Sequence, residues 1–162
     1  MIELINVKKS FGDGTDKKTV LNGVNLKLEK GDFVTVIGGN GAGKSTLLNA
    51  IGGSISVDEG KIIIGGKDVT RMPEHKRAAF LGRVFQDPLN GTAADMQIIE
   101  NLALAKRRGK RKTLKWCIGK NETEEYRQLL KEFDLGLEDR LTQKVGTLSG
   151  GQRQALTLLM AS

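Results

Sequence analysis

The chain has 162 residues, a net charge of +7, and contents of 38% hydrophobic and 28% charged residues. These values are typical of one soluble globular domain, and no stretch approaches the roughly 18 apolar residues of a membrane-spanning helix. The single cysteine, Cys117, excludes an intrachain disulfide. The positive charge favours an anionic partner, which is a nucleotide, a nucleic acid or a phospholipid surface. The 4% aromatic content argues against base-stacking platforms for single-stranded nucleic acid.

The first half of the chain alternates between strand-like segments and turns. Phe33–Ile37 is nearly all apolar and β-branched, which predicts a strand buried on both faces. The following residues predict a helix over 45–51. The other elements expected in this half are strands over 2–7, 24–28, 61–64 and 83–85, a hairpin loop over 12–18, and a short helix over 74–80.

From about residue 91 the pattern becomes helical. Helices are expected over 98–107, 122–133 and 152–161, and the second has apolar residues at helical spacing. A stretch with eight basic and no acidic residues, 106–120, separates the first two helices. A glycine-rich turn is expected over 148–152. This order of elements indicates an α/β fold with a helical insertion.

Residues 38–46, GGNGAGKST, fit the phosphate-loop pattern G-x-x-x-x-G-K-[ST]. Glycines let the backbone wrap a phosphate with its N–H groups inward, and the helix that follows adds unpaired donors. Lys44 supplies a charge for the terminal phosphates, and the Ser45 hydroxyl is a Mg²⁺ ligand. The alternative is a glycine-rich turn without a ligand. The predicted ATP-binding residues here are Gly38, Gly39, Asn40, Gly41, Ala42, Gly43, Lys44, Ser45 and Thr46.

Residues 148–152, LSGGQ, place two glycines before the last expected helix. Such a turn is a second potential anion cradle, and the Ser149 hydroxyl can cap the helix. The alternative is a capped helix start with no ligand.

Together these motifs resemble those of the ATP-binding subunits of ABC (ATP-binding cassette) transporters, and the resemblance covers the whole chain. GGNGAGKST is similar to the family's Walker A loop, although Gly39 stands where proline or serine is more usual. VFQDP at 84–88 is similar to the glutamine loop, and LSGGQ to the signature motif. Phe11 resembles the aromatic residue that stacks on adenine. The alternative for Phe11 is a core or hairpin aromatic.

The resemblance implies an α/β fold: a P-loop NTPase core with an antiparallel β subdomain and a helical subdomain, incomplete at the C-terminus. The ATP-binding core with its β subdomain is expected at 1–90, the helical subdomain at 91–148, and the signature motif with the start of its helix at 149–162. Lys44 and Gln86 are the implied catalytic residues, and Ser45 and Gln86 the implied Mg²⁺ ligands. The alternative for Gln86 is a solvated loop residue. The residues implied to contact the γ-phosphate of ATP on the other subunit of a head-to-tail dimer are Ser149, Gly150, Gly151 and Gln152.

The implied function is energy coupling in solute transport, in which Mg-ATP binding closes a dimer and hydrolysis reopens it. The implied partners are a second ATP-binding subunit, transmembrane permease subunits and a solute-binding protein, and the implied location is the cytoplasmic face of the cell membrane. Import is favoured over export because the cassette begins at Met1 without a fused membrane segment. No nucleic acid partner is expected. The alternatives are an ABC-type ATPase acting on nucleic acid or ribosomes, and a non-hydrolytic nucleotide-binding fragment.

The chain departs from the family pattern after the signature helix. The family continues with an apolar strand ending in Asp, a catalytic Glu and a switch His, and none of these follows here. His75 precedes the signature and is expected on the surface. Without the general base, this chain alone is expected to hydrolyse ATP poorly. The parallel sheet is expected to lack strands, and the helices are expected to leave apolar surface uncovered.

The basic stretch 106–120 has two interpretations. A solvated loop between two helices is the simpler one. Contact with the anionic cytoplasmic leaflet, close to the transmembrane partner, is the other.

Overall fold

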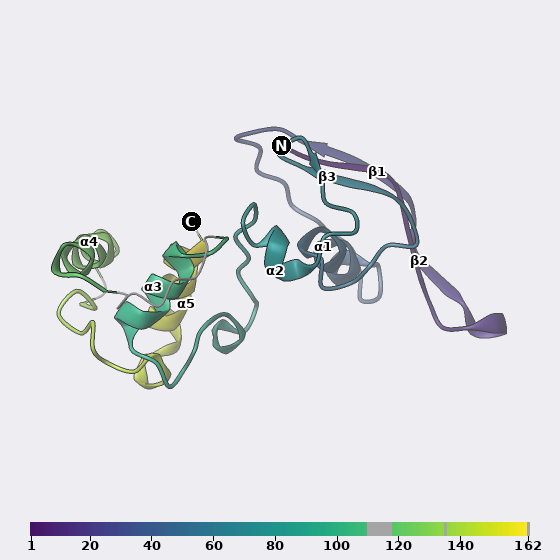
Figure 1. Ribbon diagram of the computed structural model, residues 1–162. Coiled ribbons are helices and arrows are strands. Elements are labelled where there is room, and N and C mark those ends of the chain that lie inside the picture. The colour runs from purple at the N-terminus through teal and green to yellow at the C-terminus, as the bar shows by residue number, and fades with distance from the viewer. Residues whose placement is uncertain (110–117, 135, 162) are drawn as a thin grey trace. The chain divides into compact units, whose positions relative to one another are not determined.

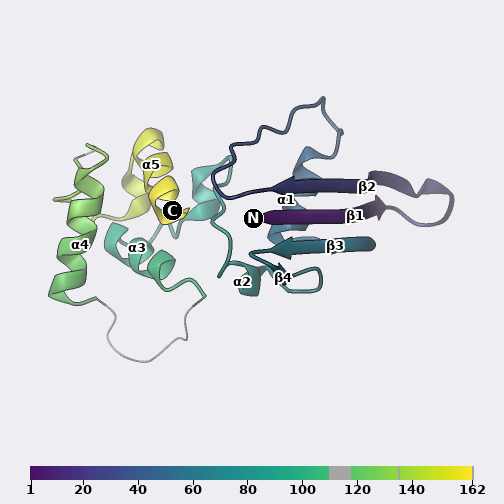
Figure 2. The same cartoon turned by 90° about the horizontal axis from the view of Figure 1, so that it is seen from above.

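A four-stranded antiparallel sheet lies in Met1–Phe80, the first of two structural units in the chain (Figure 1). The computed structural model describes residues 1–109, 118–134 and 136–161. The strand order in the sheet is β2-β1-β3-β4, and Figure 2 shows these strands side by side. The strands are β1 (Ile2–Phe11), β2 (Lys18–Leu28), β3 (Glu59–Ile64) and β4 (Lys67–Asp68).

A bulge in β1 determines which of its side chains are buried. The register with β2 shifts between Leu4 and Val7, and Asn6 has a positive φ of 49° within this interval. The Asn6 amide donates to Asn25 Oδ1 at 2.9 Å, which holds the bulge. Leu4 and Val7 are therefore both buried, although they are three positions apart in a strand whose side chains otherwise alternate. The other buried apolar residues of this unit are Leu21, Ala50, Ile62, Ile64 and Val69.

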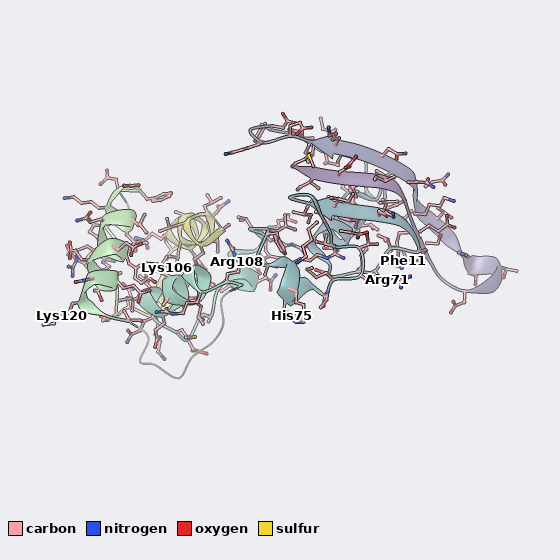
Figure 3. All side chains as sticks on the ribbon, turned by 45° about the horizontal axis from the view of Figure 1, so that its top comes forward. Phe11, Arg71, His75, Lys106, Arg108 and Lys120 are labelled. Atoms are coloured by element: carbon pink, nitrogen blue, oxygen red, sulfur yellow. The ribbon has the colours of Figure 1, made fainter. Side chains whose placement is uncertain are left out.

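Two helices accompany the sheet, α1 (Lys44–Gly52) and α2 (Glu74–Arg77). The expected helix over 45–51 is confirmed, and the short helix over 74–80 forms only over its first turn. The strands expected over 2–7, 24–28 and 61–64 are confirmed. The expected hairpin loop contains the 3₁₀ turn Gly14–Asp16. His75 lies exposed on α2, as expected of a surface residue (Figure 3).

The strand predicted over Phe33–Ile37 is wrong. This segment has no strand structure, and Phe33 and Ile37 are 95% and 88% exposed. A strand is stable when its backbone N–H and C=O groups pair with a neighbour, and no strand among the described residues pairs with this segment. Apolar surface is therefore exposed in a segment that was predicted to be buried on both faces.

The short strand predicted over 83–85 is also wrong. These residues are irregular, and Val84 is 41% exposed. The same cause applies, since no described strand pairs with them.

The second unit, Leu81–Ser162, is helical. Its helices are α3 (Ile98–Lys106), α4 (Lys120–Lys131) and α5 (Gly150–Ala161), at the three places where helices were expected. The 3₁₀ turn Pro88–Gly91 precedes α3, and the 3₁₀ turn Val145–Thr147 lies between α4 and α5. The segment before α3 pairs with residues that precede the last helix, since Ile98 N donates to Gln143 O at 3.0 Å. The core of this unit contains Ile98, Ile99, Leu102, Ala103, Tyr126, Leu130, Leu137, Leu141, Val145, Leu148 and Leu156.

The first residues of the basic stretch bind groups of their own unit. Lys106 pairs with Glu125, and the Arg107 guanidinium lies 3.0 Å from the Glu122 carboxylate. Arg108 donates to the carbonyl oxygen of Met160 at 3.3 Å, at the end of α5. These contacts agree with the simpler interpretation for residues 106–108. Residues 110–117, on which most of the lipid interpretation depends, lie outside the described residues.

Burial and hydrogen bonding shift the pKa of the Glu122 carboxylate in opposite directions. Burial raises the pKa of Glu122, while hydrogen bonds from Tyr126 and Arg107 lower it, and the net shift is downward. The Tyr126 hydroxyl donates to Glu122 Oε1 at 2.7 Å within α4, and Arg107, which directly follows α3, donates to Glu122 Oε2 at 3.0 Å and joins the two helices. None of the helices in the described part of the chain has the length and apolar character to cross a membrane.

Asn101 supports the entry to α3. This side chain is 1% exposed, accepts from Ala93 N at 2.8 Å, and donates to the carbonyl oxygens of Ala93 and Gln97 at 3.1 and 2.9 Å. Asn101→Ala removes the acceptor of Ala93 N, whereas the carbonyl oxygens of Ala93 and Gln97 keep the backbone amides of Met96 and residue 101 as donors. We therefore expect a loss of about 1–3 kcal/mol in the free energy of unfolding. Urea denaturation followed by circular dichroism measures it. Gln128→Ala, at an exposed position of α4, is the control, and an equal loss in both variants would contradict this role.

Candidate functional site

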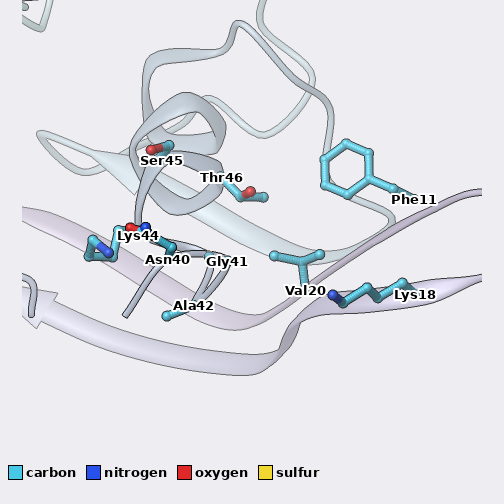
Figure 4. A pocket seen from close by; sticks show the side chains of 10 residues that line it. Phe11, Lys18, Val20, Asn40, Gly41, Ala42, Lys44, Ser45 and Thr46 are labelled. Carbon is cyan, nitrogen blue, oxygen red and sulfur yellow. The ribbon is translucent and has the colours of Figure 1, made fainter. Parts of the chain in front are cut away.

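A pocket of about 520 Å³ lies between the phosphate loop and the β1–β2 hairpin (Figure 4). It belongs entirely to the first unit. No carboxylate lies among the lining residues, which include two lysines, so the pocket favours an anion. The lining residues are Phe11, Lys18, Val20, Asn40, Gly41, Ala42, Gly43, Lys44, Ser45 and Thr46.

The phosphate loop leads directly into α1, and the first residues of this helix line the pocket. Gly43 has a φ of 88°, and a Cβ at this position would lie 3.1 Å from Val20 Cγ1 and 3.2 Å from Val20 O. Glycine therefore allows both the left-handed conformation and the close approach of the loop to β2. The first helical hydrogen bond runs from Leu47 N to Gly43 O at 2.8 Å. The amides of Lys44, Ser45 and Thr46 precede it and have no acceptor within the helix.

The Lys44 side chain stabilises the phosphate loop by hydrogen bonds to two of its carbonyl oxygens. Its Nζ donates to the carbonyl oxygens of Gly38 and Gly39 at 2.7 and 2.8 Å. Gly38 and Gly39 do not line the pocket, and they are joined to it through this side chain. The ammonium group has three N–H donors, so the two bonds leave one for a ligand.

The hairpin forms the other side of the pocket. Phe11 and Lys18 are directly opposite each other in the β1–β2 register, and both line the pocket. Phe11 is 45% exposed, and Lys9 Nζ lies 5.4 Å from the centre of its ring. Phe11 is therefore not a core aromatic. Its exposed ring offers a flat apolar surface to a ligand.

Sequence reasoning missed Lys18 and Val20. The sequence pattern predicted a strand only from residue 24, whereas β2 begins at Lys18. The alternation of positions 18 and 20 just after a hairpin loop is the signal that would have found them, since these side chains share one face of the strand.

The LSGGQ motif forms a reciprocal cap at the start of α5. Ser149 Oγ accepts from Gln152 N, and Gln152 Oε1 accepts from Ser149 N, both at 3.3 Å. This is the arrangement of a capping box. Gly150 and Gly151 are exposed, and no other residue lies within 4 Å of a Cβ built on either. The expected turn is thus the first turn of the helix, which begins at Gly150.

Gln86 is an exposed residue of the second unit, in the irregular segment that replaces the predicted strand. It precedes Asp87, whose side chain accepts from Leu89 N at 2.9 Å. The phosphate loop belongs to the first unit, and Gln86 and the signature residues to the second. The pocket therefore brings Phe11 together with residues 40–46 of the predicted site.

The donors available for a metal ion are hydroxyl and amide oxygens. Among residues 1–109, 118–134 and 136–161, no group of three His, Cys, Asp or Glu side chains is placed to hold a metal. Ser45 and Thr46 contribute hydroxyl oxygens to the pocket, and Gln86 carries an amide oxygen. Hard oxygen donors together with phosphate oxygens suit Mg²⁺, which keeps several waters when bound.

Known sequences resemble the chain over its whole length. The family model described as ABC transporter matches residues 21–162. The chain is 42% identical to a tyrosine transport ATP-binding protein of Clostridioides difficile, covering 100% of this chain and 64% of that protein. It is 37% identical to the spermidine/putrescine import ATP-binding protein PotA of Fusobacterium nucleatum, covering 99% and 38%. The chain thus spans less than two thirds of the length of these relatives.

Solved structures of ATP-binding cassettes have a fold similar to that of this chain. A dimeric structure of the ATP-binding cassette MJ0796, in a post-hydrolysis state bound to ADP and Pi, has a TM-score of 0.79 at 28% identity, covering 99% of this chain and 68% of that one. A nucleotide-free ATP-binding cassette from an ABC transporter has a TM-score of 0.73 at 31% identity, with 99% and 63% covered. These likenesses confirm the expected fold class over part of a cassette.

The capping box at Ser149 makes the signature helix sensitive to one hydroxyl. Ser149→Ala removes the acceptor for Gln152 N, so we expect the free energy of unfolding to fall by about 1 kcal/mol. Ser149→Asp is the matched control, because aspartate caps helices about as well as serine. Urea denaturation measures both, and equal losses in the two variants would show that the cap is not the cause.

Proposed function

This chain belongs to the ABC transporter family of ATP-binding proteins, and we propose that it binds Mg-ATP in the pocket between the phosphate loop and the β1–β2 hairpin. The observation that carries the proposal is the composition of this pocket. A helix N-terminus, a lysine that braces the loop, and an exposed aromatic ring line one cavity that contains no carboxylate. A nucleoside triphosphate has the matching parts, which are a polyanionic chain and a flat base.

Each part of the site has a role in this proposal. The free amides of Lys44, Ser45 and Thr46 donate to the phosphates, and the positive end of the α1 dipole favours their charge. Lys44 Nζ turns from the loop carbonyls toward the terminal phosphates, with a free donor to begin the exchange. The base stacks on Phe11, and Val20 supports it from β2.

Mg²⁺ accompanies the triphosphate in this proposal. The ion supplies charge neutralisation for the phosphate oxygens when bound. Ser45 and Gln86 are the proposed ligands, because both carry oxygen atoms of the kind that Mg²⁺ takes. Lys44 and Gln86 are the proposed catalytic residues.

The whole protein is proposed to be the ATP-hydrolysing subunit of an importer at the cytoplasmic face of the cell membrane. The name of the Fusobacterium nucleatum relative, a spermidine/putrescine import ATP-binding protein, supports import, and that of the tyrosine transport ATP-binding protein supports transport. The proposed partners are a second ATP-binding subunit, permease subunits and a solute-binding protein. The open surface at Gly150 and Gly151 supports an approach by the ATP of the second subunit, together with Ser149 and Gln152. The proposed division is an ATP-binding core at 1–90, a helical subdomain at 91–148 and the signature segment at 149–162.

Lys44→Ala is the first test of nucleotide binding. The substitution removes the cation that neutralises the terminal phosphates, so we expect ATP to bind at least about tenfold more weakly. Titration with a fluorescent ATP analogue in the presence of Mg²⁺ measures the dissociation constant.

Lys30→Ala is the matched control for this experiment. It removes the same charge from an exposed turn that does not line the pocket. The wild type and this control are expected to bind alike. Equal affinity of Lys44→Ala and the wild type would overturn the proposed site.

A further inference from the structure

The buried residue Arg77 has no place in the site described so far. It ends the short helix α2, and its side chain is 2% exposed. Fully buried arginines are rare, because a guanidinium loses its hydration on burial and needs compensating hydrogen bonds. Its partners therefore indicate why the charge is placed here.

Two of those partners are at the end of the phosphate-loop helix. Arg77 Nη1 donates to the carbonyl oxygens of Ala50 and Ile51 at 2.7 and 2.9 Å. Both residues belong to the last turn of α1, where carbonyl groups have no partner within the helix. The guanidinium supplies these partners and places a positive charge at the negative end of the helix dipole.

The other two partners belong to the chain that leaves the sheet. Arg77 Nε donates to Met72 O at 2.8 Å, and Nη2 donates to Thr70 O at 3.0 Å. Thr70 is itself fixed to β3, since its hydroxyl oxygen accepts from Ile62 N at 2.9 Å. One guanidinium therefore joins the last turn of α1 to the antiparallel sheet with four of its five N–H donors.

Gly53 leaves the space that the Arg77 side chain occupies beside the end of α1. Gly53 follows α1 with a φ of 87°, and a Cβ built on it would lie 2.8 Å from Arg77 Nε and 2.9 Å from Cδ. Any larger residue would displace the guanidinium or the end of the helix. The arginine and the glycine thus act together at this end of α1.

We propose that Arg77 is a positioning residue for nucleotide binding, which fixes the far end of α1 so that the start of the helix holds its amides and Lys44 at the phosphates. The inference rests on the proposed function. The helix has nine residues, so its two ends are only about 13 Å apart at 1.5 Å per residue. Over that length a helix turns as a rigid rod, and a shift at its end is transmitted to Lys44. A misplacement of about 1 Å can cost a bound group much of its interaction energy.

Arginine suits this role better than lysine. The four acceptors face three different nitrogen atoms of one planar group. A lysine ammonium keeps the charge, but its donors diverge from one nitrogen and cannot reach both the helix and the sheet. Arg77→Lys therefore tests the geometry apart from the charge.

The test measures ATP affinity in the intact native protein, under conditions where each variant is folded by circular dichroism. For Arg77→Lys we expect the dissociation constant for Mg-ATP to rise about tenfold. Gly53→Ala keeps the arginine and displaces its guanidinium, so a rise of similar size is expected. Ile64→Ala is the control, because it opens a cavity at a buried residue of the same unit that is none of the partners of Arg77. This control is expected to lower the free energy of unfolding and to leave the affinity within about twofold of the wild type.

A double-mutant cycle with Lys44 separates positioning from general weakening. If Arg77 acts by placing Lys44 and its neighbouring amides, Arg77→Lys has a smaller effect on ATP affinity in the Lys44→Ala background than in the wild type. Equal effects in both backgrounds, or wild-type affinity of folded Arg77→Lys and Gly53→Ala, would overturn the inference. Failure of the wild type itself to bind ATP would overturn the proposed function instead, so the two failures are distinct.

Discussion

The placement of the first turn of α1 is the constraint on which the candidate site depends. The loop reaches this turn where Gly43 packs closely against Val20, and a side chain at Gly43 would be crowded there and strained by the positive φ. The lysine that follows ties the loop to itself through two carbonyl oxygens. The helix dipole, the free amides and the cation then converge on one pocket, which the hairpin completes with Phe11 and Lys18. A change in the path of β2 would therefore alter the loop as well as the hairpin.

The exposed segment Phe33–Ile37 shows how far local sequence determines structure. Its composition is typical of a buried strand, yet burial and pairing depend on neighbours that are distant in sequence. No described strand supplies them, so the segment leads into the phosphate loop without strand structure. The loop and α1 form even so, because their geometry depends on local glycines and on contacts with β2 and Arg77. The helix is thus fixed by the antiparallel sheet.

The parts of the site that could be predicted are those whose chemistry is local in sequence. The phosphate loop, the helix that follows it and the serine cap at 149 each depend on residues within a few positions of one another, so a pattern reveals them. Lys18 lines the site because the strand register places it opposite Phe11. Arg77 binds Ala50 of α1, which is 27 positions away in the sequence. No periodicity encodes such contacts. Nor does a pattern reveal that the Glu122 carboxylate joins the end of α3 to α4, since Arg107 follows α3 and Tyr126 lies on α4.

The two glycine-rich helix starts differ in a way that suits the separate roles proposed for them. Gly43 caps α1 without any side-chain hydrogen bond, so all the early amides of that helix remain for a ligand. At α5 the Ser149 hydroxyl occupies the Gln152 amide, and the Gln152 side chain occupies the Ser149 amide. Only the Gly150 and Gly151 amides then precede the first helical bond, from Arg153 N to Ser149 O. The start of α1, with its free amides and Lys44, can hold a whole polyphosphate. The start of α5, with two free amides on an open surface, suits a single terminal phosphate of a nucleotide that is already bound at another site. Two hydrogen bonds of the capping box hold the start of α5, and a surface that is ordered before a ligand arrives loses less entropy on contact.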